Sequence, residues 1–307
     1  MTNSAQRRIA AIGLAGITAA ALALAGCGST GTTSTSASPS GTGSTGDSAP
    51  ADSGPAPEVV RILASEWTYT ITGSPHAGLV ELQVSNLGAV THEFGLVRVR
   101  DGVTLSQVKK ALGRGEAAAR ALQADPDTEI TSPGIAGPQV NEQVVVPLVA
   151  GHYIVTSYLP DSGRRSQVDR GMIGEFTVQD AAATAPTPPQ TVGTVTLTDD
   201  AITIPAGFDN GGTFEVTNTG TKPHDLSLAH LRGAPLPEYF RCVAQSYAKG
   251  TRLDDCPGVL QGGVGALQPG ESAYLTAVFG PGEFGYVSTQ GGGADFQAGL
   301  NGTFTKS

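Results

Sequence analysis

The chain has 307 residues, a net charge of −9 and only 15% charged residues, with 42 glycines and 20 prolines. So few charged residues argue against helical bundles and coiled coils, which are rich in charged, long-chain helix formers. The acidic balance, without clustered Lys and Arg, argues against nucleic acid as a partner. Three cysteines are too few for a Cys-rich zinc module, and the length suggests two domains.

The chain begins with an export signal. A short basic region precedes an apolar run over residues 9–25, which ends in Leu24-Ala-Gly-Cys27. An ordinary signal peptide ends in small residues without cysteine, and this ending resembles the lipobox of bacterial lipoproteins. The resemblance implies that residues 1–26 are removed and that lipid on Cys27 holds the protein at the cell membrane, facing outside the cytoplasm. The alternative is an uncleaved membrane anchor, although the run is short for a spanning helix.

Two segments of biased composition divide the rest of the chain. Residues 27–57 are almost entirely Gly, Ser, Thr, Ala and Pro, which predicts a disordered tether that spans roughly 30 Å. Residues 180–190 are rich in Ala, Thr and Pro and predict a semi-extended linker. These segments leave two predicted domains, residues 58–179 and 191–307, each of an ordinary domain size.

Short alternating apolar runs between turn residues predict strands in both domains. They cover residues 59–63, 67–71, 78–85, 93–99, 143–148, 152–157 and 173–178 in the first domain, and 193–197, 201–204, 212–217, 225–230, 272–278, 285–288 and 301–305 in the second. Each domain also contains one predicted helical stretch, residues 105–122 and 237–247, and the glycine runs 262–263 and 291–293 are interpreted as turns. This many short strands predicts an antiparallel sandwich or barrel.

Two cysteines remain if Cys27 carries lipid. An even number of cysteines in an exported protein favours a disulfide, here between Cys242 in the second helical stretch and Cys256 in the loop after it. The alternatives are two reactive thiols or half of a metal site, although the spacing of the pair is not that of a zinc knuckle.

The two predicted domains repeat one unit. Residues 214–228 align with residues 82–96, so that Asn, Gly, His and the following acid recur at an offset of 132. Further on, residues 282–288 align with 151–157, and residues 299–305 align with 171–177. Three matched blocks in one order predict a tandem duplication of one β-fold.

The repeated unit resembles a known family. A strand, Asn-x-Gly-x-x-x-His, a second strand, and Gly-x-Tyr before a final loop and closing strand are similar to the cupredoxins, the β-sandwiches of small blue copper proteins. The resemblance implies an all-β fold of two tandem cupredoxin-like Greek-key β-sandwiches, each with a short helical insertion. In that family a His after the Asn-x-Gly turn binds copper together with a Cys, a second His and a Met from the final loop, a set that suits both copper oxidation states.

The first domain keeps two of the four ligand positions. His92 and Met172 stand where the resemblance places the first His and the Met, whereas Ser157 and Gln167 stand in place of the Cys and the second His. A serine hydroxyl and a glutamine amide are poor copper ligands. The sequence therefore predicts no blue copper here and no cofactor.

The second domain departs further from the family pattern. His224 remains, but Ser288 and Leu300 stand in place of the Cys and the Met, and glycines occupy the loop between them. Both motif histidines are interpreted as residues that hydrogen-bond neighbouring loops. The acid that follows each of them, Glu93 or Asp225, is expected to orient the imidazole ring.

These observations predict a non-enzymatic exported lipoprotein that binds or helps to assemble an unidentified envelope protein. The alternative is a copper-binding or electron-transfer protein with a residual non-blue site at His92 and Met172, with His224 as a further candidate metal ligand. The chain has no His-x-His pair, which argues against the two-domain copper oxidases and nitrite reductases, and no Gly-x-Ser-x-Gly elbow. An enzyme with an unfamiliar interdomain cleft is the third hypothesis, and no motif points to its reaction.

Overall fold

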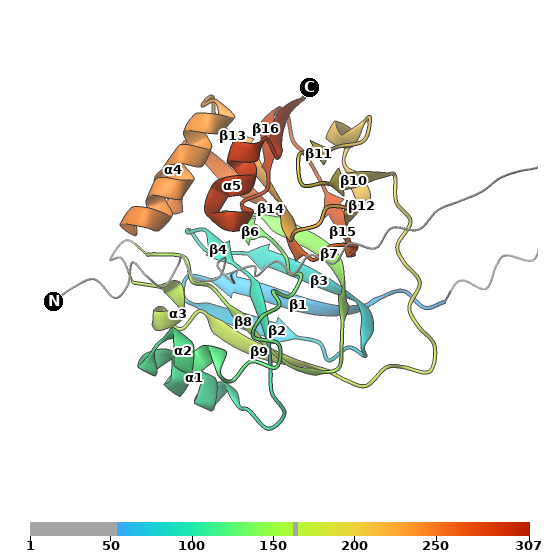
Figure 1. Ribbon diagram of the computed structural model, residues 1–307, viewed down its shortest axis with the longest axis vertical. Coiled ribbons are helices and arrows are strands. Elements are labelled where there is room, and N and C mark those ends of the chain that lie inside the picture. The colour runs from blue at the N-terminus through green and yellow to red at the C-terminus, as the bar shows by residue number, and fades with distance from the viewer. Residues whose placement is uncertain (1–53, 162–164) are drawn as a thin grey trace, which may run out of the picture. The chain divides into compact units, whose positions relative to one another are not determined.

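Alternating apolar residues, many of them β-branched, make strands the commonest regular structure of the described chain. The computed structural model describes residues 54–161 and 165–307, which belong to one compact unit (Figure 1). The predicted signal peptide (residues 1–26), Cys27 and the tether as far as residue 53 lie outside the described residues. None of the described helices is long and apolar enough to cross a membrane.

The first half of the structure, residues 58–179, is built from two groups of strands. One group is β2-β1-β3-β7, in which β1 lies parallel to β3 and the other pairs are antiparallel: β1 (Glu58–Ser65), β2 (Thr68–Thr72), β3 (Gly78–Asn86) and β7 (Asn141–Leu148). The other is the antiparallel sheet β5-β8-β9: β5 (Gly95–Val99), β8 (Gly151–Thr156) and β9 (Ile173–Val178). Two short strands complete this half, β4 (His92–Glu93) and β6 (Ile135–Ala136).

Three helices belong to the first half. The predicted helix over residues 105–122 is divided at Gly115 into α1 (Leu105–Arg114) and α2 (Glu116–Arg120). Gly115 has a φ of 113°, which interrupts the helix and which glycine adopts without steric cost. The start of α1 is set by Thr104 and Gln107, whose side chains cap each other's backbone N–H groups. The third helix is α3 (Gln167–Arg170).

The second half, residues 191–307, follows the same strand pattern. The first group, again with one parallel pair, is β11-β10-β12-β15: β10 (Gly193–Leu197), β11 (Ile202–Thr203), β12 (Gly212–Asn218) and β15 (Ser272–Ala277). The second group is antiparallel: β13 (His224–Leu231), β14 (Gly258–Leu267), β16 (Gly282–Val287) and β17 (Asn301–Lys306). Its helical segments are η1 (Phe208–Asn210), α4 (Leu236–Lys249), η2 (Leu253–Asp255) and α5 (Gln290–Ala298). The predicted all-β sandwich architecture is present.

The two halves share their sheets. β15 pairs antiparallel with β7, which joins the first groups into one sheet of eight strands. β14 pairs with β6 at Gln261 and Ala136, which extends the second group to β4 in a sheet of six strands. Residues 180–190 contain no helix or strand. Main-chain pairing, in addition to the linker, therefore connects the halves.

Glycines 262 and 263 lie inside β14, so their interpretation as a turn was wrong. β14 pairs with β13 through a register shift, and φ is 86° at Gly262 and 142° at Gly263. A Cβ at Gly263 would lie 1.8 Å from the carbonyl oxygen of Leu226 on β13. The close approach of two backbones at a β-bulge requires glycine here. Because the two glycines interrupt the apolar alternation, that pattern did not predict the strand.

Candidate functional site

The four ligand-like positions of the first half come together at the ends of different elements. His92 begins β4, Ser157 follows β8, Gln167 begins α3 and Met172 precedes β9, and all four are buried. The backbone N–H of Ser157 donates to the carbonyl of Met172, and that of Met172 donates to the carbonyl of Gln167. We call these four residues the first-half site.

Gln167 connects the polar groups of the first-half site. Its Nε2 donates to the carbonyl oxygen of Thr91 (2.8 Å), so its Oε1 faces His92 and Ser157. That oxygen accepts from Nδ1 of His92 (2.7 Å) and from Oγ of Ser157 (2.8 Å). Because an amide oxygen only accepts, this network assigns an imidazole hydrogen to Nδ1, so that Nε2 is the unprotonated nitrogen when the ring is neutral.

The environment of His92 favours the neutral imidazole. The side chain is fully buried, and Nε2 has no hydrogen-bond partner among the described residues. Burial lowers the pKa of His92, an effect opposed by the Gln167 hydrogen bond and by the charges of Glu66 and Asp254.

The Asn-x-Gly turn holds this histidine in place. Asn86 donates from Nδ2 to the carbonyls of Val90 and Ala136, and its Oδ1 accepts from the N–H of Gly88. Asn218 makes the equivalent contacts in the second half, to the carbonyls of Lys222 and Leu267 and from the N–H of Gly220. The buried asparagine therefore closes the turn by satisfying backbone groups, which explains the need for that residue type.

The acids that follow the histidines do not orient the rings, and that expectation was wrong. Oε2 of Glu93 accepts from the backbone N–H of Tyr158 (2.8 Å), and Oδ1 of Asp225 accepts from that of Thr289 (2.6 Å). Successive side chains of a strand point to opposite faces, so an acid next to the histidine faces away from it. These carboxylates instead hold the segment after β8 or β16. Burial raises the pKa of both carboxyl groups.

In the second half, an aspartate stands between the histidine and the serine. His224 begins β13, Ser288 follows β16 and Leu300 precedes β17, and all three are buried. Oδ2 of Asp295 on α5 lies 2.6 Å from Nδ1 of His224 and accepts from Oγ of Ser288, also at 2.6 Å. We call His224, Ser288, Asp295 and Leu300 the second-half site.

His224 also contacts a second carboxylate. Its Nε2 lies 3.0 Å from Oδ1 of Asp199. Carboxylates only accept, so both contacts are hydrogen bonds when both ring nitrogens carry hydrogen and the imidazole is charged. Hydrogen bonds from Thr221 and then from His224 hold the pKa of Asp199 well below its usual range.

Sequence reasoning missed Asp295 and Asp199. The glycines at 291–293 concealed the position equivalent to Gln167, yet Asp295 precedes Leu300 by the same number of residues as Gln167 precedes Met172. That spacing from the closing strand was the available signal. Asp199 lies on the loop after β10, far from the motif, and nothing in the sequence points to it.

The residues present at these sites do not fit a type 1 copper centre. Neither site contains a thiolate, and the nitrogen of His92 that faces Gln167 already carries a hydrogen. Among the residues that the structure describes, no three His, Cys, Asp or Glu side chains form a group able to hold a metal ion. The remaining histidines have other contacts: His76 with Glu58, His152 with Glu175, and His230 stacked on Phe284.

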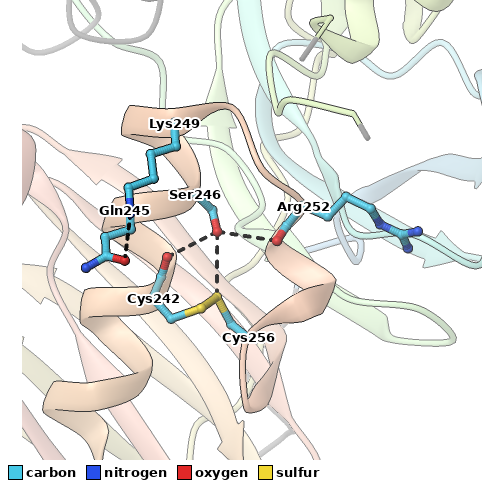
Figure 2. Close-up of a disulfide and its surroundings, with 6 residues drawn as sticks. All are labelled: Cys242, Gln245, Ser246, Lys249, Arg252 and Cys256. Carbon is cyan, nitrogen blue, oxygen red and sulfur yellow. Dashed lines mark hydrogen bonds between the residues drawn. A yellow bond between two sulfur atoms is a disulfide. The ribbon is translucent and has the colours of Figure 1, made fainter. Parts of the chain in front are cut away.

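The disulfide between Cys242 and Cys256 is formed. It connects α4 to the residue after η2, with a Cα–Cα distance of 5.7 Å. Ser246, one turn after Cys242 on α4, lies close to both ends of the bridged segment: its Oγ is 3.1 Å from the carbonyl oxygen of Cys242 and 3.7 Å from Sγ of Cys256 (Figure 2). Cys256 is buried with Leu236, Tyr239 and Val243 of α4.

Neither a protein-family model nor a curated protein matches the chain. Auracyanin A, a blue copper protein from Chloroflexus aurantiacus, is similar over 40% of this chain and 99% of its own, with 23% identity and a TM-score of 0.28. A reduced auracyanin from Roseiflexus castenholzii covers 40% of this chain and 98% of its own, with 20% identity and a TM-score of 0.26. A multicopper oxidase is similar over 81% of this chain and 88% of its own, with 13% identity and a TM-score of 0.23. Likenesses this weak do not bear on activity.

Proposed function

We propose that the chain is an exported, lipid-anchored, non-enzymatic protein that binds or helps to assemble an envelope protein. Its two cupredoxin-like halves no longer hold type 1 copper. The observation that supports this most directly is that hydrogen-bond networks occupy both ligand-like sites, with Gln167 or Asp295 placed between a histidine and a serine. The lipid anchor rests on the lipobox ending at Cys27.

The chemistry of the two serines supports a role without catalysis. A serine nucleophile needs a base that accepts its proton and a path for substrate. Ser157 donates to an amide oxygen, which is not a base, and Ser288, although it lies against the carboxylates of Asp225 and Asp295, is fully buried like Ser157, so no path leads substrate to either. Buried hydrogen-bond networks of this kind rigidify the loops that they connect, which suits a scaffold.

Rebuilding the ligand set is expected to restore copper binding. The Ser157→Cys/Gln167→His variant would add the thiolate and the second imidazole to His92 and Met172, so it should take up one copper with intense blue colour. The unmodified chain should take up none. Residues 28–307 are stripped of metal and titrated with copper, and elemental analysis is read beside the visible spectrum.

A matched control separates the thiolate from the imidazole. The Ser157→Ala/Gln167→His variant adds only the imidazole and should show no intense blue colour. Stoichiometric copper uptake by the unmodified chain, lost on His92→Gln, would contradict the proposal and support the residual-site alternative at His92 and Met172.

Replacing Cys27 is expected to release the protein from the membrane. Without the thiol no lipid can be attached, and the remaining chain offers no basic patch to bind anionic lipid. After cell fractionation, Cys27→Ser should move from the membrane to the soluble fraction or remain as the unprocessed precursor. A mature Cys27 that carries no lipid by mass spectrometry would refute the anchor.

A further inference from the structure

The segment between α4 and β14 is attached to α4 at both ends. We call residues 251–256 the strap. At its start, the N–H of Thr251 donates to the carbonyl of Ser246, and Oγ of Ser246 bonds the carbonyl of Arg252 (3.3 Å). At its end, Cys256 is joined to Cys242 by the disulfide (Figure 2). The disulfide is therefore the covalent attachment of the strap to the helix.

The strap hydrogen-bonds the first half through Asp254, and its Leu253 is buried in an apolar cluster with Leu159 of the first half. Oδ1 of Asp254 accepts from both the N–H (3.0 Å) and Oγ1 (2.6 Å) of Thr91. Its Oδ2 lies 3.2 Å from Nη2 of Arg252, which keeps the carboxylate in this orientation. Thr91 is the residue before His92, so the strap holds the segment that leads into the first-half site.

Thr91 connects the strap to the interior of that site. Its N–H and hydroxyl face Asp254, whereas its carbonyl accepts from Nε2 of Gln167, whose Oε1 bonds His92. A cavity of about 80 Å³ lies between the two, with Thr91 and Gln167 on one side and Arg252, Leu253 and Asp254 on the other. The strap thus lines a cavity that Gln167 of the first-half site also lines.

We propose that the strap is a closure held shut by the disulfide, and that reduction of Cys242–Cys256 opens the first-half site and exposes His92. The strap is held on the first half by the two hydrogen bonds of Asp254 to Thr91 and by the burial of Leu253 beside Leu159. These contacts depend on a short loop being constrained at both ends. Removing the covalent constraint increases the conformational freedom of that loop. None of the hydrogen bonds described above joins the strap to the second-half site. Opening of the strap is therefore expected to affect the first-half site alone.

The reductant is a dithiol, and the exchange is balanced. A thiolate of the dithiol attacks Sγ of Cys242, which is the less buried of the two cysteines. The Cys242–Cys256 bond breaks, and Cys256 leaves as a thiolate close to the hydroxyl of Ser246. The second thiol of the dithiol then displaces Cys242 from the mixed disulfide. The dithiol ends as a disulfide, and the protein gains two electrons and two protons.

Histidine modification tests this inference. Diethyl pyrocarbonate acylates accessible unprotonated imidazole nitrogens, and Nε2 of His92 is such a nitrogen once it is reachable. The purified chain is treated with the reagent before and after reduction with dithiothreitol, and peptide mass mapping follows each histidine. After reduction, the rate at His92 should rise at least about tenfold, which corresponds to less free energy than a disulfide typically contributes.

Two other histidines are internal controls. His76, whose side chain is 40% exposed, should react at the same rate in both states. His224, which is buried between Asp199 and Asp295, should stay protected in both. An unchanged rate at His92 in protein shown by mass spectrometry to carry free thiols would overturn the inference. A parallel rise at His224 would also overturn it, because the loosening would then be global.

A variant that keeps the disulfide separates the strap from the redox state. Asp254→Ala removes both bonds to Thr91, so it should raise the modification rate of His92 without any reductant. Faster amide hydrogen exchange at Thr91, whose N–H has Asp254 as its partner, should accompany it. Wild-type exchange and modification rates in Asp254→Ala would show that Asp254 does not hold the site closed.

Discussion

Replacing Gly263 with alanine is expected to lower the free energy of unfolding by about 3 kcal/mol or more. A Cβ at this position would lie 1.8 Å from the carbonyl oxygen of Leu226, which is backbone of the neighbouring strand and cannot rotate away. The φ of 142° adds a conformational cost for any residue with a side chain. Urea denaturation of the variant beside the unmodified chain measures the change.

Gly270→Ala is the matched control for this prediction. Gly270 has a φ of 82°, and a Cβ there would meet nothing within 4 Å. In this variant only the positive φ is unfavourable, so the free energy of unfolding should fall by about 1 kcal/mol. Equal losses in the two variants would contradict the argument, because the contact between β14 and β13 would then contribute nothing.

Replacing Glu142 with glutamine is expected to stabilise the protein above pH 7 by roughly 3 kcal/mol relative to the unmodified chain. Glu142 on β7 is buried, its Oε1 accepts from the N–H groups of Gly263 (2.6 Å) and Gly134 (3.1 Å), and Oε2 has no partner among the described residues. Burial raises the pKa of this carboxyl from 4.5 to about 7, although the two backbone hydrogen bonds oppose that change.

The direction of the pH dependence follows from these two values. Between pH 4.5 and about 7 the unfolded chain has released the proton of Glu142 while the folded chain retains it. The unmodified protein therefore loses stability as the pH rises through this interval, and the loss is complete above pH 7. Glutamine cannot ionise, and its carbonyl can still accept from both glycines, so the variant lacks this loss.

Urea denaturation of both proteins from pH 4.5 to pH 8 measures this effect. The other carboxyls with a raised pKa, Glu93, Glu129 and Asp225, are common to both proteins, so the difference between the two free energies isolates Glu142. A difference that stays constant over the interval would show that Glu142 titrates at the same pH in the folded and unfolded chain.

The sequence by itself determined the features that depend on local patterns. Apolar alternation located the strands around residues 78–85 and 212–217, because one side of each strand faces the core, and that periodicity is local. The repeated Asn-x-Gly turn placed His92 and His224 at the start of a strand, since Asn86 and Asn218 bond groups a few residues away. The paired cysteines after the lipobox predicted the disulfide that the structure contains.

The tertiary structure alone decided which groups face one another. Asp254 meets Thr91 and β15 pairs with β7 across more than a hundred residues of chain, and no local pattern encodes such contacts. β14 was missed because Gly262 and Gly263 interrupt its apolar pattern. They are glycines because Glu142 and the backbone of β13 lie too close to them for a side chain. The ring partners of His224 depend on how the loop before β17 closes. Periodicity reports which side of an element is buried, whereas hydrogen-bond partners are set by three-dimensional packing.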